Sequence, residues 1–438
     1  MTFPKDKQDL AMKAALTALA VACTAKFAFS RAFYTEAMIG PFFALALGSV
    51  VILHLRIVPK WRDFLCVAFG TAAMAFVCFR LLHFPHAVMA WFSFAGLASF
   101  LALAIRAVWQ DERRRLLLYA WIPALLFVAS EYFASTMLDW TTAAHPRTLD
   151  EYLLLFDASL RFQPAFVAGQ IYTAVPWLHT ISLIAYIGLA IPVTMVFAGL
   201  LVRNGKGAFP AILAFLVMGP IGILFYNLFP VAGPAALFGH SFPFNPLPYD
   251  KLVRVILEPV AIAGARNGMP SLHLSWTLLA WWYSRKLSAI ERSTAFLFLG
   301  LTALATLGTG EHWLADLVAA VPFALMIEAL CAYELPLNDV RRYTAFLFGL
   351  GTTLGWLLLF RYCTRLFWTS PVVPWTLIAG TVVLSAIRQG ILARAEESIR
   401  NGTPVVTPAP ARSAAGRSLR TEESTGGTGV PEVVSGRM

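Results

Sequence analysis

The sequence predicts an all-α protein that crosses a membrane about twelve times, and three features of the 438-residue chain support this prediction. First, 58% of the residues are hydrophobic and only 13% are charged, whereas soluble proteins carry roughly 25% charged and 45–50% apolar residues. Second, apolar stretches of about 20 residues, enough to cross a bilayer as a helix, recur along the chain. Third, the basic residues gather between alternate pairs of these stretches.

The positions of the apolar stretches give the predicted spans. Short polar or charged segments separate them, apart from two longer connections at 138–171 and 231–269. The predicted spans are residues 10–30, 36–55, 63–82, 86–106, 116–137, 172–202, 208–230, 271–285, 293–310, 312–334, 343–361 and 371–388.

The distribution of lysine and arginine gives an independent prediction of orientation. With the N-terminus in the cytoplasm, 24 of the 34 basic residues lie on the cytoplasmic side and 10 on the other side. Cytoplasmic loops of membrane proteins carry an excess of basic residues, so this distribution predicts that both termini are cytoplasmic. It also accounts for the net charge of +10, which therefore does not indicate a nucleic-acid partner.

Two short motifs at the beginning of apolar spans carry the candidate chemistry. The first, from Arg266 to His273, reads Arg-Asn-Gly-Met-Pro-Ser-Leu-His, and the second, from Gly308 to Asp316, reads Gly-Thr-Gly-Glu-His-Trp-Leu-Ala-Asp. The predicted topology places both motifs at the extracytoplasmic face. His312 and Asp316 are four residues apart, so on a helix they share one face. A carboxylate at this spacing can hold one imidazole nitrogen while the other nitrogen attacks phosphorus.

These motifs predict three catalytic residues: His312 as the nucleophile, Asp316 as its orienting partner and His273 as the general acid for the leaving oxygen. Phosphate oxygens need donors, which a serine-capped helix N-terminus, a guanidinium and a glycine-rich backbone can supply. The predicted substrate-binding residues are Ser271, Arg266, Asn267 and Gly310. No cluster of carboxylates suggests a metal site, so we expect no metal and no other cofactor.

At these motifs the chain resembles the type-2 phosphatidic acid phosphatase superfamily, which has a Pro-Ser-Gly-His motif and a later motif ending in His-x-x-x-Asp. The matching segments are Pro270–His273, in which Leu272 replaces the glycine, and His312–Asp316. This leucine and the segment Tyr226–Pro234 are similar to the branch of inositolphosphotransferases of inositol phosphorylceramide synthesis and their bacterial relatives. The resemblance implies a six-helix core and a phosphohistidine at His312, with His273 as the acid.

The resemblance also divides the chain into four parts. Residues 1–115 are N-terminal transmembrane helices outside the core, and residues 116–334 form the phosphatase- or phosphotransferase-like core. Residues 335–388 add two further transmembrane helices. Residues 389–438 are expected to form a largely disordered cytoplasmic tail, because their last part is rich in Gly, Ser, Thr and Pro without aromatic residues. In the outer connection, residues 149–156 predict a helix lying at the membrane interface.

Three functions of different classes fit this sequence. The first is a membrane lipid phosphatase or phosphotransferase at the extracytoplasmic face of the cell or inner membrane, acting on a phospholipid or a polyprenyl phosphate. The alternative is a non-catalytic transporter or flippase of lipid-linked substrates, which would not need the His-x-x-x-Asp spacing. A scaffold role for the tail is supported by composition alone. The sequence leaves open the lipid, the choice between hydrolysis and headgroup transfer, and the oligomeric state.

Overall fold

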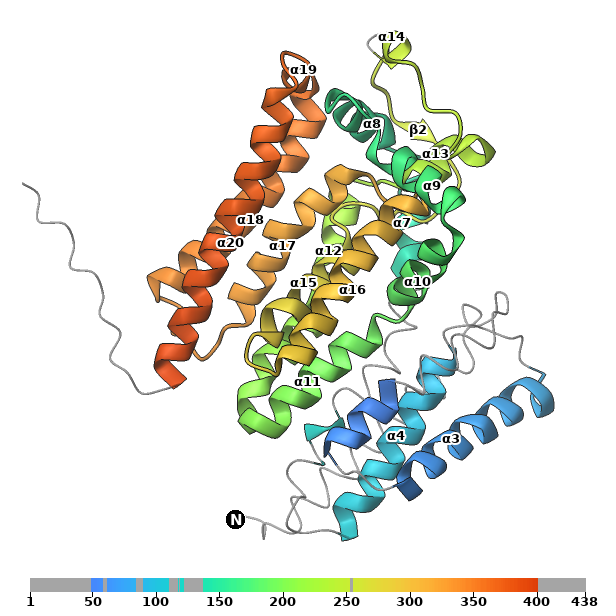
Figure 1. Cartoon of the computed structure of the whole chain (residues 1–438), viewed down its shortest axis with the longest axis vertical. Helices are drawn as coiled ribbons and strands as arrows, with labels where there is room; N and C mark the ends of the chain where they lie inside the picture. The colour runs from blue at the N-terminus through green and yellow to red at the C-terminus, as the bar shows by residue number, and fades with distance from the viewer. Residues whose placement is uncertain are drawn as a thin grey trace, which may run out of the picture.

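The computed structural model describes residues 49–57, 61–83, 90–109, 117, 119–121, 137–252 and 255–400 (Figure 1). Within these residues, regular structure is helical apart from one two-stranded ladder, which confirms the all-α prediction. Five of the described helices are long and apolar enough to span a membrane, and a bent helix pair makes a sixth. The predicted number of twelve is not confirmed. The predicted span 10–30, most of 36–55 and of 116–137, and the tail from residue 401 lie outside the described residues.

Helix α17 (Leu314–Cys331) lies at the centre of the bundle (Figure 1). It is apolar on all sides and is therefore enclosed by other helices, with most of its residues buried. Most of its contacts are with α12 (Phe209–Leu228), α15 (Leu272–Ser284), α18 (Val340–Tyr362) and α20 (Val372–Arg400). Helix α16 (Ala289–Gly308) packs against α15.

The span expected at 172–202 is a bent helix pair. Helix α9 (Pro164–Ala174) precedes it, and α10 (Pro176–Ile187) and α11 (Ala190–Asn204) meet at 51°. Pro192 has no N–H to donate to the Gly188 carbonyl one turn earlier, and its ring crowds that carbonyl. Gly188 is also a poor helix former, so the helix bends at this point. A 3₁₀ turn, Gly205–Ala208, then leads into α12.

Short elements form a cap over one end of the bundle, at the top of Figure 1. They are α8 (Asp150–Ser159), α13 (Pro234–Phe238) with the 3₁₀ turn Gly239–Ser241, α14 (Tyr249–Leu252), β2 (Val260–Ala261) and α19 (Thr364–Phe367). Helix α7 (Leu138–Ala144) leads into strand β1 (Arg147–Thr148), which pairs antiparallel with β2. The two long outer connections expected from the sequence therefore fold together.

Helix α8 differs from the interfacial helix that the sequence predicts. All of its residues except Glu151 are buried. Phe156 packs edge-on against Trp356, Phe360 and Phe367, with ring centroids 5.5, 4.9 and 4.8 Å away. Its apolar residues surround the helix, so it is enclosed by protein and does not present one apolar face to a bilayer.

A separate helical layer precedes the core. It contains a helical segment at 49–57, α3 (Trp61–Phe76), a π-helical turn (Val77–Leu81) and α4 (Ala90–Trp109), with α3 and α4 at the lower right of Figure 1. An ion pair of 3.0 Å between Asp63 and Arg106 joins α3 to α4. Another of 2.6 Å joins Arg56 to Glu291, which forms a capping box with Ser288 at the start of α16. This layer contacts the core at the beginning of α16, at the other end of that helix from the second motif.

Candidate active site

His312 and Asp316 form a buried pair at the start of α17. Nδ1 of His312 lies 3.3 Å from Oδ2 of Asp316, and neither side chain has any exposed surface. The same carboxylate oxygen accepts a hydrogen bond of 2.8 Å from the backbone N–H of Trp313. His312 precedes the first helical residue, so the pair does not lie on a helix as the spacing suggested. It forms because Asp316, in the first turn, folds back over the helix N-terminus.

The second nitrogen of the His312 ring is available for chemistry. Nε2 is buried and has no hydrogen-bond partner among the described residues. The residue is held at two points, since its backbone N–H donates to the Thr306 carbonyl at 3.0 Å and Asp316 faces Nδ1 of its ring. When Nδ1 carries the proton, Nε2 presents an unprotonated lone pair.

Ser271 joins the two motifs. Its backbone N–H donates to the carbonyl of Asp316 at 3.2 Å, which connects the start of α15 to the start of α17. The Ser271 hydroxyl makes no capping hydrogen bond, and Oγ is buried without a partner among the described residues. A buried hydroxyl without a partner is costly, so this group is suited to meet a ligand oxygen.

His273 lies in the first turn of α15 among aromatic side chains. The Tyr186 ring of α10 stacks on it with centroids 4.0 Å apart and planes inclined by 25°, and the Trp276 ring stands edge-on at 6.2 Å. Ser271, two residues before His273, donates its backbone N–H to the Asp316 carbonyl, which brings the start of α15 to the start of α17. Helix α12 packs against α15, and its Tyr226 is buried. The two predicted histidines therefore belong to one region between α10, α12, α15 and α17.

Arg266 has a different environment from the one that the sequence suggested. Its guanidinium is 2% exposed and donates to backbone carbonyls of two chain segments. The acceptors are the carbonyls of His145, Pro146, Ile262 and Gly264. These bonds hold the connection before β1 against the connection after β2. The donors of Arg266 are thus occupied within the cap and do not face an open phosphate site.

Gly310 and Asn267 also have distinct environments. Gly310 has a φ of +75°, and its carbonyl accepts from the Ala235 N–H at 2.9 Å. A Cβ at Gly310 would lie 2.8 Å from the Cβ of Ala235 and 2.9 Å from Cε1 of Phe242. Glycine is therefore required for packing of α13 against the motif. The Asn267 side chain is partly exposed and makes no hydrogen bond to a described residue.

The sequence reasoning missed two buried carboxylates of α8. Asp150 accepts hydrogen bonds from the N–H groups of Ala232 and Gly233 and from Nε1 of Trp313. Asp157 accepts from the N–H of Leu314 at 3.0 Å, and burial raises its pKa to about 8. The spacing of Asp150 and Asp157 could have indicated them, because aspartates seven residues apart share one face of a helix. The α17 N-terminus is therefore already occupied by protein carboxylates.

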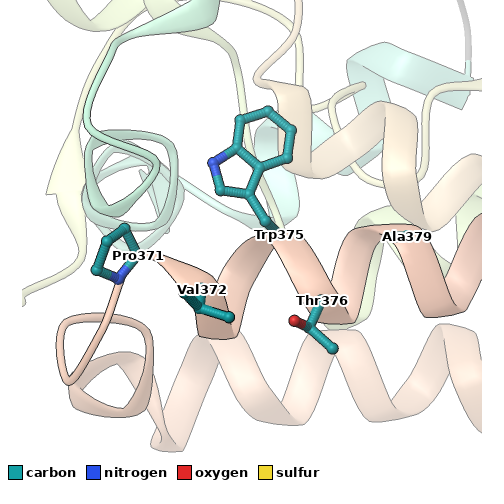
Figure 2. Close-up of a pocket in the computed structure, with 5 residues that line it drawn as sticks. All are labelled: Pro371, Val372, Trp375, Thr376 and Ala379. Atoms are coloured by element: carbon teal, nitrogen blue, oxygen red, sulfur yellow. The ribbon is translucent and has the colours of Figure 1, made fainter.

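A groove elsewhere in the structure is separate from this region. It is shallow and apolar, and Figure 2 shows its lining along the beginning of α20. Its lining residues are Pro371, Val372, Trp375, Thr376 and Ala379. The Trp375 ring stacks on Phe162 with centroids 6.1 Å apart. None of the motif residues lines this groove.

In the part of the chain that the structure describes, no group of three or more His, Cys, Asp or Glu side chains could hold a metal ion.

Comparison with known proteins gives one match. Searches of curated proteins and of solved structures found no significant match. The family model of the PAP2 superfamily matches residues 151–330, a range that contains His273, His312 and Asp316. This match supports the superfamily and does not distinguish the inositolphosphotransferase branch. Residues 151–330 are therefore similar to the PAP2 superfamily, whose members are phosphatases or phosphotransferases.

Proposed function

We propose that this protein is an integral membrane lipid phosphatase or phosphotransferase that forms a phosphohistidine at His312. The observation that carries the proposal is the state of the His312 ring. One nitrogen faces a buried carboxylate at 3.3 Å, and the other is buried without a partner among the described residues. An oriented imidazole with a free lone pair is the arrangement that nucleophilic catalysis requires.

The proposed reaction has two steps. In the first, Nε2 of His312 attacks phosphorus, the P–N bond forms and the bond from phosphorus to the leaving oxygen breaks. His273 gives its proton to that oxygen, and Asp316 stabilises the charged ring through Nδ1–H. In the second step, a water or hydroxyl acceptor attacks phosphorus while His273 takes its proton, and the P–N bond breaks. Water as acceptor makes the enzyme a phosphatase, and a lipid or sugar hydroxyl makes it a transferase.

The phosphate oxygens need donors that do not take part in bond formation. We propose that the Ser271 hydroxyl and the free N–H groups at the start of α15 supply them. The unpartnered Ser271 Oγ supports this assignment. Asn267, which is partly exposed beside the first motif, is a further proposed ligand. Gly310 contributes through its positive φ, which lets α13 pack closely against the second motif. Arg266 holds the cap, because its N–H groups already donate to carbonyls.

We propose that the site faces the extracytoplasmic side and that both termini are cytoplasmic. The basic residues support this orientation, because Arg203, Arg285 and Lys286 lie at the end of the core opposite the motifs. Reporter fusions at residue 400 and in the loop 231–269 should report opposite sides of the membrane. The same side for both fusions would overturn the orientation and the location of the site with it.

The lipid class is proposed from the chemistry of the site and from the PAP2 match, which is consistent with a lipid phosphate. The purified protein should be given mixed lipids that include phosphatidic acid, a polyprenyl phosphate and phosphatidylinositol. Release of inorganic phosphate would identify a phosphatase, and transfer of a whole headgroup would identify a transferase of the inositolphosphotransferase type. If the folded protein showed neither activity, the proposal would be contradicted. That result would favour the alternative of a lipid transporter or flippase.

A further inference from the structure

Asp150 is a buried carboxylate that contacts the second motif from outside the bundle. It is 0% exposed and begins α8. Its Oδ1 accepts hydrogen bonds of 2.8 Å from the Gly233 N–H and from Nε1 of Trp313, and its Oδ2 accepts one of 3.0 Å from the Ala232 N–H. Burial of a carboxylate costs free energy unless it is well hydrogen-bonded. The three hydrogen bonds to Asp150 offset this cost.

The donors connect Asp150 to both chain neighbours of His312. On one side, the carboxylate holds the indole of Trp313, which is 1% exposed. On the other side, it holds the turn at Gly233, which packs on the backbone of Glu311. Gly233 has a φ of +98°, and a Cβ there would lie only 2.7 Å from the carbonyl carbon of Glu311. The residues immediately before and after His312 are thus held by one side chain.

Arg266 is buried in the same cap and ties the connection before β1 to the connection after β2 through its hydrogen bonds. Asp150 ties the turn 231–233 to the second motif. The cap therefore holds these segments together around the second motif.

We infer that Asp150 is a positioning residue, which fixes the direction of the His312 ring through Trp313 and the turn 231–233. The inference rests on the function proposed above. Asp150 does not touch the reacting atoms and is not a catalytic residue. In-line attack requires the nucleophile within a fraction of an ångström of its place, and a displacement of about 1 Å can cost about 10²-fold in rate.

The test compares Asp150→Asn and Trp313→Phe with Glu151→Gln, a matched control at the adjacent, partly exposed carboxylate. The asparagine offers one acceptor oxygen where three donors converge, and the phenylalanine removes the indole N–H together with the five-membered ring that carries it. With phosphatidic acid in mixed detergent micelles, each of the first two variants should lower kcat by at least about 10-fold. KM should change by less than about threefold, because substrate contacts remain. Glu151→Gln should keep the parental kcat.

A double variant separates positioning from general loss of structure. If Asp150 acts through Trp313, Asp150→Asn with Trp313→Phe should have nearly the kcat of the worse single variant. Independent, multiplying losses would overturn the inference, and so would a parental kcat in Trp313→Phe, even if Asp150→Asn failed to fold. His312→Ala in the same assay tests the proposed function alone. Activity retained in His312→Ala refutes that function, whereas an inactive His312→Ala beside a fully active Asp150→Asn refutes only the positioning role.

Discussion

Nδ1 of His312 lies 3.3 Å from Oδ2 of Asp316, while the opposite ring nitrogen is buried without a partner among the described residues. The carboxylate also accepts from the Trp313 N–H, so its position is fixed by the helix start and not only by the histidine. This geometry favours the tautomer with the proton on Nδ1 and leaves Nε2 as a nucleophile.

Asp316→Asn should lower kcat by about 10²- to 10⁴-fold, because an amide can donate to Nδ1 and favour the tautomer whose Nε2 is protonated. Because Oδ2 faces both Nδ1 and the Trp313 N–H, an amide that turns its NH2 to Nδ1 also loses the hydrogen bond from Trp313, so the unfolding midpoint should fall as well. Steady-state kinetics and the thermal unfolding midpoint in detergent measure the two effects. Asp250→Asn, at an exposed carboxylate of the cap, is the control. Parental kcat in Asp316→Asn would show that the pair is structural only.

His273→Ala should slow cleavage of lipid phosphates far more than cleavage of substrates with good leaving groups. General acid catalysis contributes about 10²- to 10⁴-fold, and a leaving group of low pKa needs little protonation. The comparison uses an alkyl and a nitrophenyl phosphate ester with the same enzyme preparations. His240→Ala, at an exposed histidine, should leave both rates unchanged. An equal loss of rate with both esters would show that His273 is not the general acid.

The stability of the cap should depend on pH through Asp157. Burial raises the pKa of this carboxyl from 3.8 to about 8, so its contribution to stability is full below about pH 4 and is lost as the pH rises through about 8. The unfolding midpoint in detergent should therefore fall between about pH 5 and pH 8 in the wild type. Asp157→Asn should reduce this slope, because the amide does not titrate. A slope that is unchanged by the substitution, or that rises with pH, would contradict the prediction.

Activity should persist in excess chelator. The proposed mechanism assigns nucleophile, acid and phosphate donors to His312, His273 and Ser271, and positioned donors can stabilise the charge of phosphoryl transfer. The rate with EDTA should match the rate without it. Complete loss of activity that magnesium or manganese restores would mean that the chemistry has been assigned wrongly.

Most of the core helices could be predicted from apolar runs alone. Spans predicted at 208–230, 312–334 and 343–361 correspond to α12, α17 and α18 within a few residues, because their length and composition leave few alternatives. The run at 172–202 did not reveal its bend, since hydropathy does not register the Pro192–Gly188 conflict. The short run at 271–285 gave α15, which alone is too short to meet the length criterion for a span.

The candidate site could be predicted in part. The spacing of His312 and Asp316 identified the pair, although a helix start and not a helix face brings the two together. Arg266 was placed on the phosphate because the sequence cannot show that carbonyls of the connection before β1 take its donors. Asp150 and Asp157 were overlooked for a similar reason. Their partners lie about 80 or more residues away along the chain, and only the folded cap brings them together.

The most direct test of the account is the search for a covalent phosphohistidine. Purified enzyme should be mixed briefly with lipid phosphate labelled in the phosphoryl group, quenched and denatured. The account predicts a label that is stable to base, labile to acid and absent from a folded His312→Ala variant, which should also lack turnover. Label that persists in His312→Ala, or that is stable to acid and maps to a serine, would contradict the assignment of His312 as the nucleophile.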